Sequence, residues 1–210
     1  MEPNRIFLLS PARCGGKRAA MIFNDNATFP LARKLRQPGG APIGEVFSFL
    51  SGLYFRGKLA YSNHFARSAD GLSGAYVITS TRGLLPVQTP IRLDELRAFG
   101  DVDIDASDER YRRPLERDAS GLLRRLSDSC QVVLLGSVAT GKYVDVLAQV
   151  FGQKLHFPAD FVGRGDMSRG GLMLRCVESG QELSYIRVDG AIRNGRRPPK
   201  LERRSARPLL

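Results

Sequence analysis

The segment Gly136–Lys142 combines glycines and a lysine at the spacing of a phosphate-binding loop. It follows the apolar run Gln131–Leu135 and precedes a segment of helical spacing, which is the order that such a loop requires. The next residue is Tyr143, however, where magnesium coordination calls for a Ser or Thr hydroxyl. We therefore expect an anion-binding turn without ATP hydrolysis, in preference to an ATPase or an empty turn. Its candidate ligand groups are Gly136, Ser137, Thr140 and Lys142.

Two other apolar runs, residues 5–10 and 76–79, also end in short basic loops. Runs of this kind are typical of buried parallel strands, and ligands of open α/β sheets collect beyond the carboxyl ends of such strands. Backbone N–H groups and helix N-termini at that edge attract anions. The sequence therefore predicts one basic edge that binds a phosphate-bearing ligand. The candidate groups from these two loops are Ser10, Arg13, Cys14, Lys17 and Arg82.

The position of Cys14 beside Arg13 and Lys17 is one that could lower the pKa of its thiol and create a reactive thiolate. A nucleophilic Cys–His pair would need His64 or His156, the only imidazole bases in the chain. Nothing in the spacing supports such a pair, so the default interpretation of Cys14 is a small loop residue.

Four glycines occur in the stretch Gly163–Gly171, which also carries two arginines, an aspartate and a serine. Such a composition suits a loop whose backbone closely approaches a phosphate or another ligand. Asp166 is the best single candidate for a general base or for an acceptor of a ribose hydroxyl. The alternative is a glycine-rich turn in which Asp166 pairs with Arg164 or Arg169. The remaining ligand candidates here are Arg164, Ser168 and Arg169.

Aromatic and cationic residues alternate in the stretch Leu53–Tyr61, as they do on surfaces that stack nucleic-acid bases. Aromatic residues at helical spacing usually face the core instead, and both interpretations stay open. We keep Tyr54, Arg56 and Lys58 as candidate site residues.

The charge of the chain favours a polyanionic partner. Its 32 Lys and Arg outweigh 21 Asp and Glu, for a formal charge of +11, although a basic surface without such a partner has the same signature. Much of the excess lies in residues 193–210, a basic stretch with three prolines and almost no apolar periodicity. We therefore predict one α/β domain over residues 1–192 and a flexible basic tail over residues 193–210.

Three cysteines without CxxC or Cys/His spacing argue for a reducing compartment and against a structural zinc site. The acidic start of Asp101–Asp105 resembles a calcium loop, but Ala106 and Arg112 occupy the positions that need Gly and Glu. We expect no metal and no cofactor. No apolar run reaches the length of a signal-peptide core or a membrane span, so the expected location is the cytoplasm and no membrane partner is expected.

The expected fold is α/β, with a central, mostly parallel sheet flanked by helices. Strands are predicted at 5–10, 76–79 and 131–135, and helices over 43–69 (as two pieces), 111–126 and 143–151. Beyond residue 157, the short apolar runs 172–177 and 183–188 alternate with glycine-containing turns and predict a hairpin or edge strands.

The order of three motifs resembles the peroxide-stress YaaA family and a related group of small bacterial and phage domains. These motifs are Leu8-Leu-Ser-Pro-Ala-Arg13, Leu50-Ser-Gly-Leu-Tyr54, and Val77-Ile-Thr-Ser-Thr-Arg-Gly-Leu-Leu-Pro86 followed by Ile91-Arg-Leu-Asp-Glu95. The resemblance covers roughly the first half of the chain. It implies a fold akin to uracil-DNA glycosylases, DNA as the partner, and a cleft lined by Ser10, Arg13, Lys17, Tyr54, Arg82 and Leu84-Leu85. Arg13 stands where that family usually has Lys, Arg82 where Tyr or His is usual, and the second half lacks the His-Pro-Ser signature of active glycosylases.

The function predicted from the sequence is binding of DNA or a phosphate-bearing, nucleotide-like ligand at the carboxyl edge of the sheet. The alternative is an enzyme of glycosidase or transferase type that acts on a nucleotide or nucleobase with the same loops. In that case Asp166 is the base, and Lys17, Lys142 and Arg164 hold the phosphate. The residues leave open whether the protein is an enzyme, and they do not indicate an oligomeric state.

Overall fold

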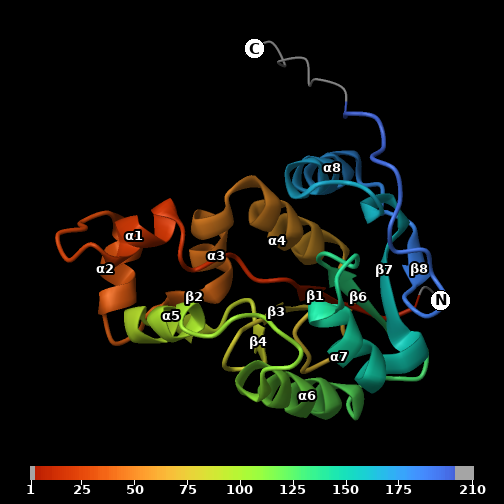
Figure 1. Ribbon diagram of the computed structural model, residues 1–210, viewed down its shortest axis with the longest axis horizontal. Coiled ribbons are helices and arrows are strands. Elements are labelled where there is room, and N and C mark those ends of the chain that lie inside the picture. The colour runs from red at the N-terminus through yellow and green to blue at the C-terminus, as the bar shows by residue number, and fades with distance from the viewer. Residues whose placement is uncertain (1–2, 202–210) are drawn as a thin grey trace.

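A six-stranded sheet forms the centre of the protein (Figure 1). The structure, a computed structural model, describes residues 3–201. The strands lie in the order β4-β3-β1-β6-β7-β8, and the inner four are parallel, with an antiparallel strand at each edge. The mostly parallel α/β fold expected from the sequence is thereby confirmed. The strands are β1 (Arg5–Leu9), β3 (Ala75–Ile78), β4 (Leu84–Pro86), β6 (Gln131–Leu135), β7 (Leu155–Pro158) and β8 (Tyr185–Arg187).

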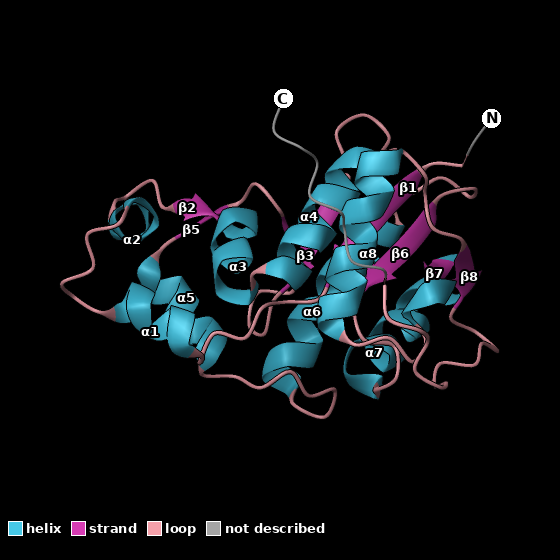
Figure 2. Cartoon of the chain, turned by 90° about the horizontal axis from the view of Figure 1, so that it is seen from above, coloured by secondary structure: helices cyan, strands magenta, loops and turns pink. Residues whose placement is uncertain are grey.

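Helices cover both faces of this sheet. In Figure 1, α4 and α8 lie above it and α6 and α7 below it. The remaining helices and a two-stranded sheet form a lobe to one side in both views (Figures 1 and 2). The layer helices are α4 (Leu53–Phe65), α6 (Glu109–Leu123), α7 (Gly141–Phe151) and α8 (Asp166–Ser179). The lobe comprises α1 (Lys17–Phe23), α2 (Pro30–Arg36), α3 (Ile43–Ser51), α5 (Leu93–Gly100), β2 (Ala41–Pro42) and β5 (Pro90–Ile91), and short 3-10 turns span Gly152–Lys154 and Ala159–Phe161.

Strand β1 explains why a continuous apolar run is needed at the centre. Ile6 and Leu8 belong to the core between the sheet and the layer of α6 and α7, whereas Phe7 and Leu9 belong to the core on the side of α4. All four are fully buried because side chains of a strand alternate between two covered faces. β1 can therefore occupy the centre of the sheet because it is apolar on both of its faces.

Two predictions for the last third of the chain are wrong. Residues 166–171, expected in a glycine-rich loop, and residues 172–177, expected as a strand, together belong to α8. Gly170 would be unfavourable in an isolated helix, but here its lack of a side chain lets α8 pack directly on the backbone of α4. A tertiary contact thus overrides the local preference.

The predicted basic tail lies only in part within the described residues. Residues 191–201 form neither helix nor strand. The backbone at Gly195 and Arg196 nevertheless passes directly over Gly163, and the side chain of Leu201 lies against Gly171. The beginning of this segment therefore packs on the loop before α8, and residues 202–210 lie outside the described part.

Within residues 3–201, no helix combines the length and the apolar character that crossing a bilayer would require.

Candidate functional site

The connections that follow β1 and β6 lead in opposite directions across the sheet. From β1 it proceeds through α4, on one face, to the neighbouring strand β3, and from β6 it proceeds through α7, on the opposite face, to β7. The loops after β1 and β6 therefore lead to opposite faces of the sheet, and we call the region outside the carboxyl ends of these two strands the crevice. Ligands of open α/β sheets bind at such switch points. We define the crevice loops as residues 10–16 and 136–140.

Ser10 and Gly136 form the floor of the crevice. The backbone N–H of Ser10 donates to the carbonyl oxygen of Leu135 at 3.2 Å. A Cβ added at Gly136 would lie 2.9 Å from Cβ of Ser10, closer than carbon atoms can approach without strain. A glycine at 136 is therefore required by this contact, which brings two of the sequence-predicted loops together.

Lys58 reaches this floor from α4. Its side chain is fully buried, and Nζ donates to the carbonyl oxygen of Ser10 at 2.5 Å and lies 3.0 Å from Ser10 Oγ. The same Nζ lies 4.3 Å from the ring centre of Tyr54 and 4.8 Å from that of Phe55. Burial lowers the pKa of Lys58 to about 7, with Asp166 raising it and Arg169 lowering it further.

A group of titratable side chains surrounds Lys58 and Ser10. Asp166 and Arg169 come from the start of α8, with Arg169 Nη1 3.6 Å from Asp166 Oδ1. Burial raises the pKa of Tyr54 to about 12. Burial also raises the pKa of Tyr143 at the start of α7, and the nearby Tyr54 and Asp166 raise it further. Both phenols are therefore protonated at neutral pH.

Tyr54 has the only buried phenol oxygen without a hydrogen bond among residues 3–201. Its Oη is inaccessible and makes no hydrogen bond of normal geometry, although Ser10 and the guanidinium of Arg169 lie beside it. Arg169 instead donates from Nε and Nη2 to the carbonyl oxygen of Phe161, at 3.3 and 2.9 Å. A buried donor without a partner of normal geometry is costly, and Ser10 and Arg169 are the groups placed to reduce that cost.

Backbone N–H groups in both crevice loops are free. None of those in residues 12–16 and 137–140 donates a hydrogen bond to another residue within 3–201. Consecutive N–H groups without internal acceptors form the kind of concavity that binds phosphate and other anions. The crevice loops therefore offer anion-binding groups from both sides of Ser10.

The exposed cations near the crevice differ in their surroundings. Arg13 and Lys17 form no ion pair within the described residues. Lys142 lies near Asp105. Hydrogen bonds from Ser107 lower the pKa of the Asp105 carboxyl most, and the charge of Lys142 lowers it to a smaller extent. The carboxylate of Asp145 also lies directly beside Gly141, where a Cβ of residue 141 would be, at the start of α7. The acidic surroundings make the α7 end a weaker anion site than its motif suggests.

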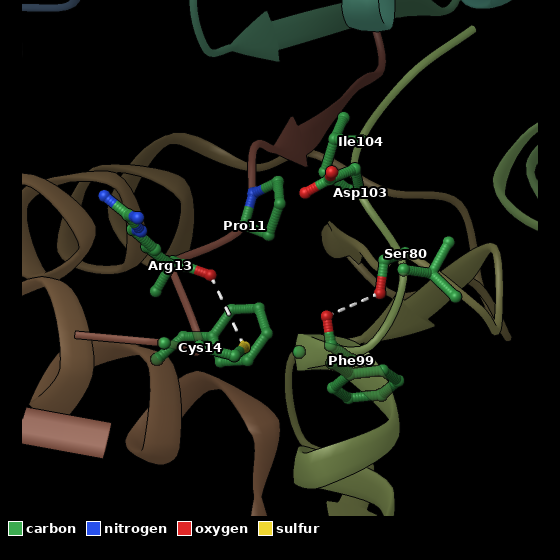
Figure 3. Close-up of a pocket in the computed structure, with 12 residues that line it drawn as sticks. Pro11, Arg13, Cys14, Ser80, Phe99, Asp103 and Ile104 are labelled. Carbon is green, nitrogen blue, oxygen red and sulfur yellow. Dashed lines mark hydrogen bonds between the residues drawn. The ribbon is translucent and has the colours of Figure 1, made fainter. Parts of the chain in front are cut away.

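A cavity of about 230 Å³ adjoins the crevice at the ends of β1 and β3 (Figure 3). Residues 11–15 form one wall and residues 99–100 and 102–104 the other, with Arg13 and Asp103 as its charged groups. Ser80 Oγ donates to the carbonyl oxygen of Phe99 at 2.9 Å and so ties the loop after β3 to the end of α5. The cavity has a size and a mixed lining that suit part of a small ligand.

The structure favours the default interpretation of Cys14, a small loop residue, over a reactive thiolate. The side chain is buried, and Sγ donates to the carbonyl oxygen of Ala12 at 3.6 Å (Figure 3). Desolvation raises the pKa of this thiol to about 12. The nearby cations of the sequence do not lower the thiol pKa because Arg13 and Lys17 both extend into solvent.

The other candidates lie at various distances from this arrangement. Arg82 forms an ion pair with Glu95, and Arg56 is exposed on α4. Arg164 donates to Ser168 Oγ at 3.1 Å and to a backbone carbonyl, which holds the turn before α8. Thr140 is exposed and makes no side-chain cap of α7, and Ser137 is half-buried in its loop.

Several residues of the site were not among the candidates from the sequence. Tyr143 was considered only as a departure from the ATPase motif, and Asp103 only as part of an acidic loop. Ser80 lies within the third motif of the resemblance but is not among its site residues, and Phe99 belongs to no motif; both line the cavity. Only Tyr143 had a usable signal, because it directly follows Lys142 at the start of a predicted helix.

No group of three or more His, Cys, Asp or Glu side chains within residues 3–201 is arranged to hold a metal ion. Comparison with known proteins finds no family model that matches the chain and no curated protein or solved structure with significant similarity to it. The assignment of function therefore rests on the residues and geometry of the crevice.

Proposed function

We propose that the crevice between the ends of β1 and β6 binds a phosphate-bearing, nucleotide-like ligand or the backbone of DNA. The observation that carries this proposal is the set of free backbone N–H groups in the crevice loops, residues 12–16 and 137–140. Such groups bind phosphate oxygens without a metal ion, and they lie at the position where α/β sheets bind nucleotides.

The charges and the adjoining cavity support the same ligand class. Arg13 and Lys17 supply positive charge that no described carboxylate neutralises. The cavity beside them, with Phe47 and Phe99 in its lining, can take an uncharged part of the ligand such as a base or sugar. A phosphate at the crevice loops and a ring in the cavity would satisfy both regions at once.

The resemblance to the YaaA family is what favours DNA over a free nucleotide. On the same resemblance we also propose a role in stress response and a site that includes Leu84-Leu85. Cysteine usage supports a cytoplasmic location. An enzyme acting on a nucleotide or nucleobase is the second candidate, favoured by Asp166, whose carboxylate lies close enough to Lys58, Tyr54 and Tyr143 to shift their pKa values.

A binding experiment with charge variants tests the proposal. Affinity for a fluorescent DNA duplex and for a fluorescent nucleoside monophosphate is measured by anisotropy over a range of salt concentrations. Arg13→Ala and Lys17→Ala should each weaken binding, and each lost phosphate contact should reduce the slope of log affinity against log salt by about 1. Arg124→Ala is the matched control, because this exposed arginine follows α6 at the opposite edge of the sheet.

A pair of substitutions at Gly15 tests the backbone groups directly. Its φ is not positive, and a Cβ there would meet no atom within 4 Å, so Gly15→Ala should bind as the wild type does. Gly15→Pro removes one N–H group and should weaken phosphate binding at an unchanged melting temperature. Equal binding by both variants, or equal effects of the Arg13 and Arg124 substitutions, would contradict the proposed site.

A further inference from the structure

The Ser10–Lys58 pair is the most unusual feature of the crevice. A buried lysine normally pairs with a carboxylate, because an isolated buried ammonium group is costly. No carboxylate oxygen within the described residues lies within 4.0 Å of Lys58 Nζ, whose hydrogen-bond partners are the carbonyl oxygen and the hydroxyl of Ser10. Nζ donates to both of these oxygens, and once it has lost a proton the same nitrogen can accept from the Ser10 hydroxyl while it still donates to the carbonyl oxygen.

We propose that Ser10 is a nucleophile and Lys58 its general base in the transfer of a phosphoryl group from a phosphate ester of the proposed nucleotide-like class. This inference rests on the proposed function for its substrate class. A hydroxyl paired with a base at hydrogen-bond distance is the arrangement of activated serines, and lysine is a known base in such pairs.

Exposure assigns the two roles. Ser10 keeps 5% of its surface exposed, whereas Lys58 has none. A ligand can therefore not reach the amine, and Ser10 is the only member of the pair with any exposed surface. Ser10 is thus the group that forms the bond, and Lys58 acts on it from behind.

The groups around Lys58 keep its amine available as a base near neutral pH. Desolvation in the interface between α4 and α8 lowers its pKa to about 7, and the charge of Arg169 acts in the same direction. Asp166 opposes this shift from the exposed start of α8. Tyr54 on α4 and Tyr143 on α7 stay protonated and add no charge. Lys58 therefore loses its proton far more readily near neutral pH than an exposed lysine does.

The proposed step transfers one proton and exchanges one bond. Lys58 takes the proton from Ser10 Oγ while this oxygen forms a bond to phosphorus. The bond between phosphorus and the ester oxygen breaks, and the leaving alcohol takes the proton back from Lys58. Attack of water on phosphorus then releases phosphate and restores the Ser10 hydroxyl.

The backbone donors beside Ser10 suit the charge on the phosphoryl oxygens. The free N–H groups of residues 137–140 follow Gly136, which contacts Ser10 directly. Donors that are fixed before the reaction stabilise developing negative charge most effectively.

Labelling with a small alkyl fluorophosphonate tests the pair without relying on nucleotide binding. Attack by Ser10 breaks the P–F bond and leaves a phosphonyl group on Oγ, which intact-mass and peptide mass spectrometry detect. Labelling should map to Ser10, be lost in Ser10→Ala, and increase in rate from about pH 6 to about pH 8 as Lys58 loses its proton. Ser129→Ala, at the opposite edge, should label as the wild type does.

Substitutions of the base and of its neighbour separate catalysis from folding. Lys58→Met should abolish labelling while keeping the melting transition, whereas Lys154→Met should not affect labelling. Asp166→Asn removes the charge that raises the pKa of Lys58, so the midpoint of the pH profile should move to lower pH. No label on Ser10 in the folded protein, or the same rate and pH profile in folded Lys58→Met, would overturn the proposal. Because Ser10→Ala should still bind the fluorescent nucleotide, binding without labelling refutes only the nucleophile, and labelling without binding refutes only the proposed ligand.

Discussion

Gly57 of α4 and Gly170 of α8 are in direct backbone contact. A Cβ added at Gly57 would lie 2.7 Å from the carbonyl oxygen of Gly170, and one added at Gly170 would lie 2.8 Å from the carbonyl oxygen of Leu53. This close approach places the start of α8, with Asp166 and Arg169, beside Lys58. The electrostatic environment of the crevice thus depends on two residues that carry no side chain.

Gly57→Ala should destabilise the fold and disturb the crevice, because the added methyl group must push the two helices apart. Overpacking of this kind costs about 1–3 kcal/mol in unfolding free energy, measured by urea denaturation. The matched variant is Gly121→Ala in α6, where a Cβ would meet only the side chain of Arg124 at 3.8 Å. That variant should gain roughly 0.5–1 kcal/mol from helix propensity alone. A stabilised Gly57→Ala variant would show that the helices are not held this closely.

Lys58→Met should change how stability depends on pH. Burial lowers the pKa of Lys58 from 10.5 to about 7, so between these values the unfolded chain binds a proton that the native protein does not. The wild type therefore becomes more stable relative to Lys58→Met as pH rises through this window, by about 1.4 kcal/mol per pH unit at most. Denaturation of both proteins at about pH 7 and about pH 9 measures this difference. Parallel pH profiles would show that Lys58 is charged in the folded state.

Glu182→Gln should weaken the attachment of β8 and the chain before it. The Glu182 carboxylate pairs with Arg5 of β1 and with Arg67, and it accepts a hydrogen bond from Tyr185 Oη at 2.8 Å. Removing its charge leaves the largely buried Arg5 without its counter-ion, at a cost of about 1–3 kcal/mol. The control is Glu45→Gln, whose partner Lys34 is half exposed, with an expected change within about 0.5 kcal/mol. Equal losses of unfolding free energy in the two variants would show that the ion pairs of Glu182 contribute no more than the exposed pair of Glu45.

Cys14 should react slowly with iodoacetamide in the folded protein. Burial raises the pKa of its thiol to about 12, so almost no thiolate exists near pH 8, and burial also raises the pKa of Cys130 and Cys176. Mass spectrometry should find little alkylation in buffer and full alkylation in denaturant. Selective modification of Cys14 under native conditions would restore the thiolate that its neighbours in the sequence suggest.

The sheet was predictable because its signal is local. Val132–Leu135 of β6 are apolar at every position, a pattern that a strand needs when both of its faces are covered. Helix α8 was not predictable in the same way. Its glycines oppose a helix locally, and only contact with α4 makes Gly170 favourable.

The sequence by itself determined which loops follow the central strands, and so it determined that Ser10 and Gly136 lie at one edge of the sheet. Only the tertiary structure decided that Lys58, 48 residues from Ser10 along the chain, meets it through a buried hydrogen bond. The physical reason is that burial and pKa are properties of the space around a side chain. In the sequence Lys58 is one cation among 32 Lys and Arg, and only the packing of α8 on α4 removes it from water.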